Sequence, residues 1–256
     1  MKPYFSVFGK TIPFYGLFYF IGIGVAITAA LLLRKKSKIP VFDLVCSAVY
    51  TMIGAVFGAK LLFLLVSMEQ IIELKLSFEA ILKGGFVFYG GLIGGAIGLF
   101  VYVKQFKLHF FDYFDLYAVV LPLGHAFGRV GCFTAGCCYG VHYDGFGNYT
   151  YRYAADVATP IGVPLLPIQL IEAACLFVLF IVLLIFYVKK HNSKGFCLTA
   201  YACSYSVLRI LLEFFRGDKA RGLFLGISTS QWISLFLFVG ILTLRSVLFM
   251  KNRKNG

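Results

Sequence analysis

An arginine inside an apolar stretch is the feature of this chain with the clearest chemical potential. Arg129 lies in the run 128–140, which holds four glycines and three cysteines at the end of a long apolar segment. A guanidinium at the centre of a bilayer costs about 2.5–3.5 kcal/mol, so the charge needs an anionic partner. Glycines let the backbone approach such a partner closely. The run therefore predicts a site for an anionic ligand.

A second group of charges lies in another apolar stretch. Arg209, Glu213 and Arg216 are spaced i, i+4 and i+7, so on a helix they share one face. A buried arginine and glutamate can simply hold helices together. Alternatively, Glu213 orients guanidinium groups whose planar fork binds a phosphate. Gln169 and Glu172 bring polar groups to a third apolar stretch, and convergence of the three stretches would bury all of these side chains together.

Seven cysteines are present, and three of them lie beside Arg129. Cys132, Cys137 and Cys138 lack the paired C-x-x-C spacing of zinc or thioredoxin-like sites. Local packing or a disulfide is therefore predicted here, and no metal. The other four cysteines lie in apolar stretches, where cysteine behaves as a small apolar residue.

Three further side chains could exchange a proton or donate a hydrogen bond near these charges. His125 precedes Arg129 by one helical turn and would share its face. It is either a proton acceptor or a hydrogen-bonded helix residue. Tyr15 and Tyr89 lie in apolar stretches and could hydrogen-bond a lipid headgroup.

The elements that must position these residues are membrane helices. The chain is 60% hydrophobic and 14% charged, with a mean hydropathy of +0.87. A soluble globule of this length would not carry that balance, so an all-α integral membrane protein is predicted. Seven stretches are long enough to cross about 30 Å of hydrocarbon. They are 14–33, 42–66, 84–103, 116–133, 165–188, 196–215 and 224–244.

The net charge of +13 is distributed unevenly over the loops between these stretches. Alternate short loops hold most of the basic residues, so the N-terminus is predicted outside and the C-terminus in the cytoplasm. This topology, with attraction to anionic lipid, explains the charge and argues against nucleic acid as a partner. Residues 1–256 are predicted to form one polytopic domain with extracytoplasmic segments near 67–83 and 134–164, the first an amphipathic helix at the interface.

The third predicted span carries glycines at regular spacing. Gly90, Gly94 and Gly98 are spaced i, i+4 and i+8, so they lie on one face of a helix. Small residues in this pattern let neighbouring helices pack backbone to backbone. Helix packing is therefore predicted for this face.

These motifs together resemble those of the bacterial prolipoprotein diacylglyceryl transferases. The core Gly-Arg-Val-Gly-x-Phe at 128–133, closing at Gly140, is similar to the signature of that family. Further similarities are Tyr15-Gly16-Leu17, Gly90-Gly91-Leu92-Ile93-Gly94, Pro167-x-Gln169-Leu170-x-Glu172, Arg209-x-x-x-Glu213-Phe214-Phe215-Arg216 and Gln231. The similarity runs in order along nearly the whole chain.

The resemblance implies an enzyme of the bacterial cell (inner) membrane that moves a diacylglyceryl group from phosphatidylglycerol to the lipobox cysteine thiol of a prolipoprotein. A thioether forms and glycerol phosphate leaves. By position, Arg129 and Arg209 would bind the lipid phosphate, Glu213 would orient them, and Tyr15 and Gly140 would shape the pocket. The expected partners are phosphatidylglycerol, the prolipoprotein signal peptide and membrane lipid, and no cofactor is expected.

The chain departs from the family pattern at three positions. Tyr89 stands where the third-span motif has a histidine, and Cys132 and Cys137 replace an asparagine and an acidic residue. The base that activates the acceptor thiol is therefore unassigned among Tyr89, His125 and an unrecognised residue. The candidate catalytic residues are Arg129, Arg209, Glu213, Tyr89 and His125, and the candidate substrate-binding residues are Tyr15, Gly128, Gly131, Gly140, Gln169, Glu172 and Arg216.

Two alternative functions stay open at this point. A divergent paralogue could use the same headgroup pocket for another acceptor. A non-catalytic phospholipid-binding or transport membrane protein could retain the anion pocket, although transport favours an internal repeat, which the sequence does not show.

Overall fold

The computed structural model describes residues 3–7, 10–73, 85, 87–156, 158–189, 194–218, 223–224 and 227–254. The chain divides into two compact units. The first, Arg34–Phe114, is called the glycine unit below. The second combines Met1–Leu33 with Asp115–Gly256 and is called the arginine unit.

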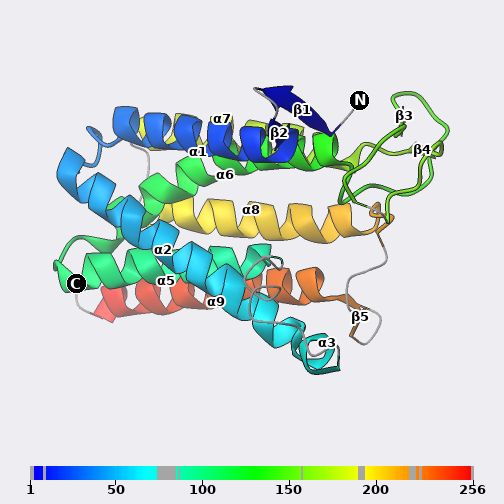
Figure 1. The fold of residues 1–256 in the computed structure, drawn as a ribbon. Helices are drawn as coiled ribbons and strands as arrows, with labels where there is room; N and C mark the ends of the chain where they lie inside the picture. Colours follow the sequence, from blue (N-terminus) through cyan, green and yellow to red (C-terminus); the bar gives the residue numbers. More distant parts are fainter. Residues whose placement is uncertain are drawn as a thin grey trace. The chain divides into compact units, whose positions relative to one another are not determined.

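Helices occur at all seven predicted stretches (Figure 1). They are α1 Phe14–Leu33, α2 Val41–Val66, α5 Phe88–Gln105, α6 Phe110–Ala135, α7 Ile168–Lys189, α8 Phe196–Glu213 and α9 Thr229–Lys254. Helices α1, α2, α6, α7 and α8 are long and apolar enough to cross a membrane, and α9 contains the shorter apolar stretch Thr229–Thr243. The prediction of an all-α membrane protein is thereby confirmed.

The predicted boundaries differ most at the end of α9, which reaches Lys254 rather than residue 244, and at the start of α6, which begins at Phe110 rather than at residue 116. Asp112 and Asp115 lower the hydropathy at the start of α6, so a search for apolar stretches misses its first residues. Asp112 lies in the first turn, where its charge interacts favourably with the positive end of the helix dipole. The ring of Phe110 stacks on that of Phe114 one turn later, with centroids 4.0 Å apart.

Three short two-stranded antiparallel ribbons accompany the helices. They pair β1 Tyr4–Val7 with β2 Lys10–Pro13, β3 Tyr149–Thr150 with β4 Pro164–Leu165, and β5 Leu223–Phe224 with β6 Ile227–Ser228. None was predicted, because such short strands hold too few alternating positions to form a pattern. Of the amphipathic helix expected at 67–83, α3 covers Met68–Glu73, and residues 74–83 lie outside the described residues.

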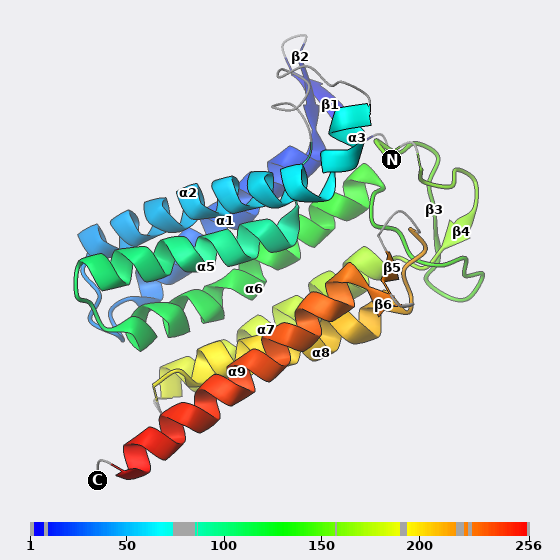
Figure 2. The ribbon, with the colours of Figure 1, turned by 90° about the horizontal axis from the view of Figure 1, so that it is seen from below.

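In the glycine unit, α2 and α5 lie side by side along their glycines (Figures 1 and 2). A Cβ added to Gly94 would overlap the carbonyl oxygen of Gly54 and lie 2.9 Å from the Cα of Gly58. Gly90 and Gly98 face α2 backbone in the same way. The predicted packing face is confirmed, and it has no room for a side chain at these positions.

In the arginine unit, α7, α8 and α9 lie along one another (Figure 2). Helix α6 approaches α1 closely, since a Cβ on Gly22 would lie 2.8 Å from the carbonyl oxygen of Gly124. Asp115 of α6 accepts hydrogen bonds from the backbone N–H groups of Gly195 and Leu198, at 2.7 and 2.9 Å. These bonds satisfy free donors at the start of α8, so the N-terminal parts of α6 and α8 lie together.

Candidate functional site

Arg129 lies near the end of α6 and is buried, with 8% of its surface exposed. Its Nε lies 3.0 Å from Oε1 of Glu172, which is buried near the start of α7. Two charges out of water are tolerated when they are paired in this way. Glu172 was predicted to contact the substrate, and the structure places it against Arg129.

Arg209 lies near the end of α8 and is 2% exposed. Its Nη2 lies 2.6 Å from Oε2 of Glu213, one turn further along the same helix. The same nitrogen donates to Oγ of Ser230 on α9 at 3.3 Å. Glu213 thus pairs with Arg209, whereas the carboxylate beside Arg129 is that of Glu172. Ser230 carried no signal in the sequence.

His125 connects the two arginines. It lies on α6, and its ring meets that of Tyr205 on α8 edge to face, with centroids 5.3 Å apart. Both Arg129 and Arg209 are close enough to His125 to act on it electrostatically. Arg129 also interacts with Tyr205. The fold thus brings two guanidinium groups that are distant in the chain to the same partly buried histidine.

Arg216 does not share the helical face predicted for it, because α8 ends at Glu213. It lies instead in an antiparallel bridge with Gly140. Its guanidinium donates to both carboxylate oxygens of Asp218, from Nε at 3.0 Å and from Nη2 at 2.9 Å. Partial burial raises the pKa of Asp218 above its usual value, although the charge of Arg216 acts in the opposite direction.

Gly140 closes the signature at a point of close backbone approach. A Cβ there would overlap the carbonyl oxygen of Leu166 and lie 3.0 Å from its Cβ. On the other side, the N–H of Gly217 donates to the carbonyl of Tyr139 at 3.0 Å. The segments after α6, after α8 and before α7 therefore meet at this glycine, which explains why a larger residue does not fit.

Gln169 was predicted to bind substrate, and the structure shows that its amide holds the turn after α6. Its Nε2 donates to the carbonyl of Cys137 at 2.8 Å and to the hydroxyl of Tyr151 at 3.3 Å. Tyr151 donates in turn to the carbonyl of Phe133 at 3.1 Å. Burial raises the pKa of Tyr151, so the hydroxyl stays a neutral donor. Within the described residues, the buried Oε1 of Gln169 has no hydrogen-bond partner.

The thiols of Cys132, Cys137 and Cys138 form a cluster in which the three sulfur atoms all lie within 4.8 Å of one another. Gly136 and Cys138 have left-handed backbone conformations, with φ of 82° and 59°, and so turn the chain back toward Cys132. All three cysteines carry free thiols and are partly buried.

Interactions among the three thiols lower the pKa of Cys138 and raise that of Cys137. Hydrogen bonds with the other two thiols, together with nearby guanidinium charges, hold the pKa of the Cys138 thiol below its usual value. The guanidinium groups belong to Arg216 and Arg129. A positively charged surrounding of this kind makes a cysteine more reactive toward metals and electrophiles.

The remaining predicted residues occupy different surroundings. A Cβ on Gly131 would lie 3.2 Å from the carbonyl oxygen of Tyr15, so these two residues pack where α1 meets α6. Tyr15 interacts electrostatically with all three thiols of the cluster. Around Gly128, no described atom lies within 4 Å of an added Cβ. Tyr89 lies on α5 in the glycine unit, where its ring contacts Phe88 edge to face.

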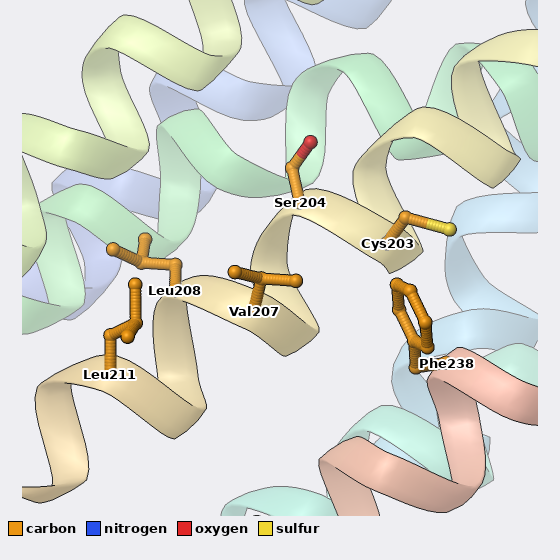
Figure 3. Close-up of a pocket in the computed structure, with 6 residues that line it drawn as sticks. All are labelled: Cys203, Ser204, Val207, Leu208, Leu211 and Phe238. Atoms are coloured by element: carbon orange, nitrogen blue, oxygen red, sulfur yellow. The ribbon is translucent and has the colours of Figure 1, made fainter.

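An apolar groove of about 470 Å³ lies between α8 and α9 (Figure 3). Its lining residues are Cys203, Ser204, Val207, Leu208, Leu211 and Phe238. With 3.6 residues per turn, the lining residues of α8 project from the side of the helix opposite to Arg209 and Glu213. The groove is therefore separate from the charged site.

Comparisons with known proteins agree with the motifs. The family model described as prolipoprotein diacylglyceryl transferase matches residues 3–246. The phosphatidylglycerol-prolipoprotein diacylglyceryl transferase 2 of Clostridium perfringens is 32% identical over 251 residues, which cover 97% of this chain and 96% of the relative. The transferase of Clostridium tetani is 35% identical over 246 residues, covering 94% and 96%. That of Campylobacter curvus is 28% identical, covering 92% and 89%.

Proposed function

Because the chain belongs to the prolipoprotein diacylglyceryl transferase family, we propose that it transfers the diacylglyceryl group of phosphatidylglycerol to the lipobox cysteine of prolipoproteins. The observation that carries this assignment at the site is the convergence of Arg129 and Arg209 on His125. Their separate carboxylate partners hold both guanidinium groups in place.

The reaction requires cations at the phosphate. The acceptor sulfur attacks a glyceryl carbon, the bond from that carbon to the phosphate oxygen breaks, and the electron pair remains on the phosphate. Positioned guanidinium groups stabilise this developing charge. An arginine has five N–H donors, so the contact of the Arg129 Nε with Glu172 leaves terminal amino groups to bind a phosphate.

The other predicted residues receive roles around these two arginines. Glu213 and Glu172 orient the guanidinium groups, and Tyr15 and Gly140 shape the pocket. Gly128, where a side chain would meet open space, allows close approach of the lipid. His125 and Tyr89 remain the predicted proton acceptors. Arg216 and Gln169 act by holding the segment that follows α6.

The proposed enzyme spans the bacterial inner membrane seven times as one polytopic domain, with its N-terminus outside and its C-terminus in the cytoplasm. Helices at all seven predicted positions support this topology. The contact of Asp115 with the start of α8 supports it as well, because α6 and α8 then run in the same direction, with α7 returning between them. Segment 134–164 then lies outside, next to the arginines.

The test is complementation of a bacterium depleted of its own transferase. Conversion of a prolipoprotein to its diacylglyceryl form, measured by mass spectrometry, is the expected result. Inserted protein that binds phosphatidylglycerol without producing this mass increase would favour the paralogue with another acceptor or the non-catalytic lipid-binding protein. A lipobox Cys→Ser substrate is the matched control, since it offers no thiol.

A further inference from the structure

We propose that Cys132, Cys137 and Cys138 bind a Zn²⁺ ion through three thiolates, and that the fourth position of this ion takes the acceptor cysteine. The metal site is argued from the cluster itself. Only the use of the fourth position rests on the proposed transferase function.

The geometry of the cluster is close to that of a zinc site. With Zn–S bonds of about 2.3 Å, tetrahedral ligands place sulfur atoms about 3.8 Å apart. The three sulfur atoms already lie within 4.8 Å of one another, so rotation of the side chains and a small closure of the turn would complete the site. The sequence did not predict this site because the ligand spacing is not C-x-x-C.

The backbone that carries these thiols is held in a strained conformation. Cys138 has a φ of 59°, which is uncommon for a residue with a Cβ and needs support from its surroundings. That support comes from hydrogen bonds to the two preceding carbonyls. Gln169 donates to Cys137 at 2.8 Å, and Thr159 donates to Gly136 at 2.8 Å. These two hydrogen bonds hold the turn in a conformation in which the three sulfur atoms lie close together.

Charge and exposure also suit a thiolate-bound zinc. Three thiolates and one Zn²⁺ carry a net charge of −1, which the guanidinium groups that act on Cys138 can balance. Sulfur ligands select soft ions such as zinc rather than magnesium or calcium. Each of the three cysteines is only partly buried, so the cluster keeps an accessible side. Three protein ligands with an open fourth position are typical of catalytic zinc sites.

The fourth position suits the acceptor of the proposed reaction. A thiol that binds zinc does so as a thiolate, and its proton passes to water. The bound sulfur then attacks the glyceryl carbon, a sulfur–carbon bond forms, and the carbon–oxygen bond to the phosphate breaks. The glycerol phosphate anion leaves beside the arginines, and the neutral thioether product dissociates from the metal. No atom changes oxidation state, and no protein base is required.

The first test measures metal binding by the purified, reduced full chain in detergent. One Zn²⁺ per chain is expected by elemental analysis, and Co²⁺ in its place should show thiolate-to-metal charge-transfer absorption. Cys132→Ser, Cys137→Ser and Cys138→Ser should each lower the zinc affinity by about 100-fold or more, since even outer-shell changes cost about 10- to 100-fold. Cys175→Ser, on α7, is the matched control and should not change it.

The wild-type protein alone can overturn the metal site. Absence of bound Zn²⁺ at stoichiometric metal, absence of the cobalt charge-transfer band, or a disulfide among the three cysteines in freshly trapped membranes would each do so. This measurement on the wild-type protein depends neither on transferase activity nor on whether the serine variants fold.

The second test concerns the fourth position. A lipobox peptide should change the cobalt spectrum, and its Cys→Ser counterpart should not. Removal of the metal should lower diacylglyceryl transfer by about 100-fold or more, with recovery on adding Zn²⁺. Unchanged transfer without metal would overturn this role and leave the transferase standing. A zinc-loaded wild-type protein without transfer would instead overturn the proposed function.

Discussion

The α2–α5 contact in the glycine unit and the run 128–140 in the arginine unit use glycine in different ways. Along α2 and α5, a Cβ on Gly54, Gly58 or Gly94 would overlap the backbone of the facing helix. In the run 128–140, the surroundings differ from one glycine to the next, from open space at Gly128 to the carbonyl of Leu166 at Gly140. Regular spacing therefore indicates helix packing, whereas irregular spacing beside a buried cation indicates a site.

The largest expected effect comes from removing the cations that distinguish the second region. Arg129→Ala and Arg209→Ala should each lower transfer by about 100- to 1000-fold, since each removes donors to the developing phosphate charge. Arg129→Ala also removes the ion pair of the buried Glu172 carboxylate, which costs about 3–5 kcal/mol. Mass spectrometry of the lipoprotein and thermal unfolding of the purified variant measure the two effects.

The matched control for these variants is Arg152→Ala, since Arg152 is exposed in the segment 134–164. It should retain transfer. Lysine at position 129 or 209 keeps the charge without the planar fork, and it should fail as well if bidentate binding is required. Full transfer by both alanine variants would remove these arginines from the site.

The next effect separates two glycines of the same run. Gly140→Ala should destabilise the protein by about 1–3 kcal/mol, because the added methyl group overlaps the Leu166 carbonyl. Gly128→Ala on α6 should leave the unfolding temperature unchanged or raise it slightly, because its Cβ meets open space among the described residues and alanine favours the helix. A fall in transfer by Gly128→Ala would therefore come from the bound lipid. Equal destabilisation by the two variants would contradict the distinction.

A smaller effect is expected for packing in the glycine unit. Gly94→Ala should lower the stability of the α2–α5 contact by about 1–2 kcal/mol, because overpacking outweighs the better helix propensity of alanine. Gly24→Ala on α1, where no described atom lies within 4 Å of the added Cβ, is the control. It should be neutral or stabilising by up to about 1 kcal/mol. Thermal unfolding of both variants in detergent measures the difference.

The smallest effect compares one tyrosine hydrogen bond in each unit. Tyr151→Phe removes the donor to Phe133, and Tyr102→Phe removes the donor to Asp43. Each change should cost about 0.5–1.5 kcal/mol of stability, the usual net worth of such a bond. Tyr151→Phe should also lower zinc affinity, since its hydroxyl contacts the Gln169 amide that holds Cys137. Equal zinc affinity in both variants would show that the hydrogen bonds of Tyr151 and Gln169 do not support the thiol cluster.

The helices and the isolated cations could be predicted from the sequence because their signals are local. Apolar stretches of sufficient length predicted the seven long helices among the described residues, and Arg129 and Arg209 stand out within such stretches. The glycine face of α5 was predicted for the same reason, since the spacing along one helix determines it.

The partners that lie on other segments could not be predicted, because they depend on contacts between parts of the chain that are distant in sequence. Glu172 pairs with Arg129 across two helices. Arg216 lies past the end of α8, so its spacing from Arg209 carries no helical meaning. The thiol cluster depends on the left-handed conformation of Cys138, which spacing rules for metal ligands do not include.

The contact of Asp115 with the start of α8 has a consequence for the alignment of the two guanidinium groups. Arg129 lies about 21 Å beyond Asp115 along α6, and Arg209 about 17 Å beyond Leu198 along α8, at about 1.5 Å per residue. Both distances start from the contact that the Asp115 carboxylate makes with the start of α8. Inserting a single residue into either helix between that origin and its arginine would swing the guanidinium by about 100°. The Asp115 contact is therefore a common reference point for both helices. The number of residues from this point to each arginine determines the depth at which the two guanidinium groups can bind one phosphate.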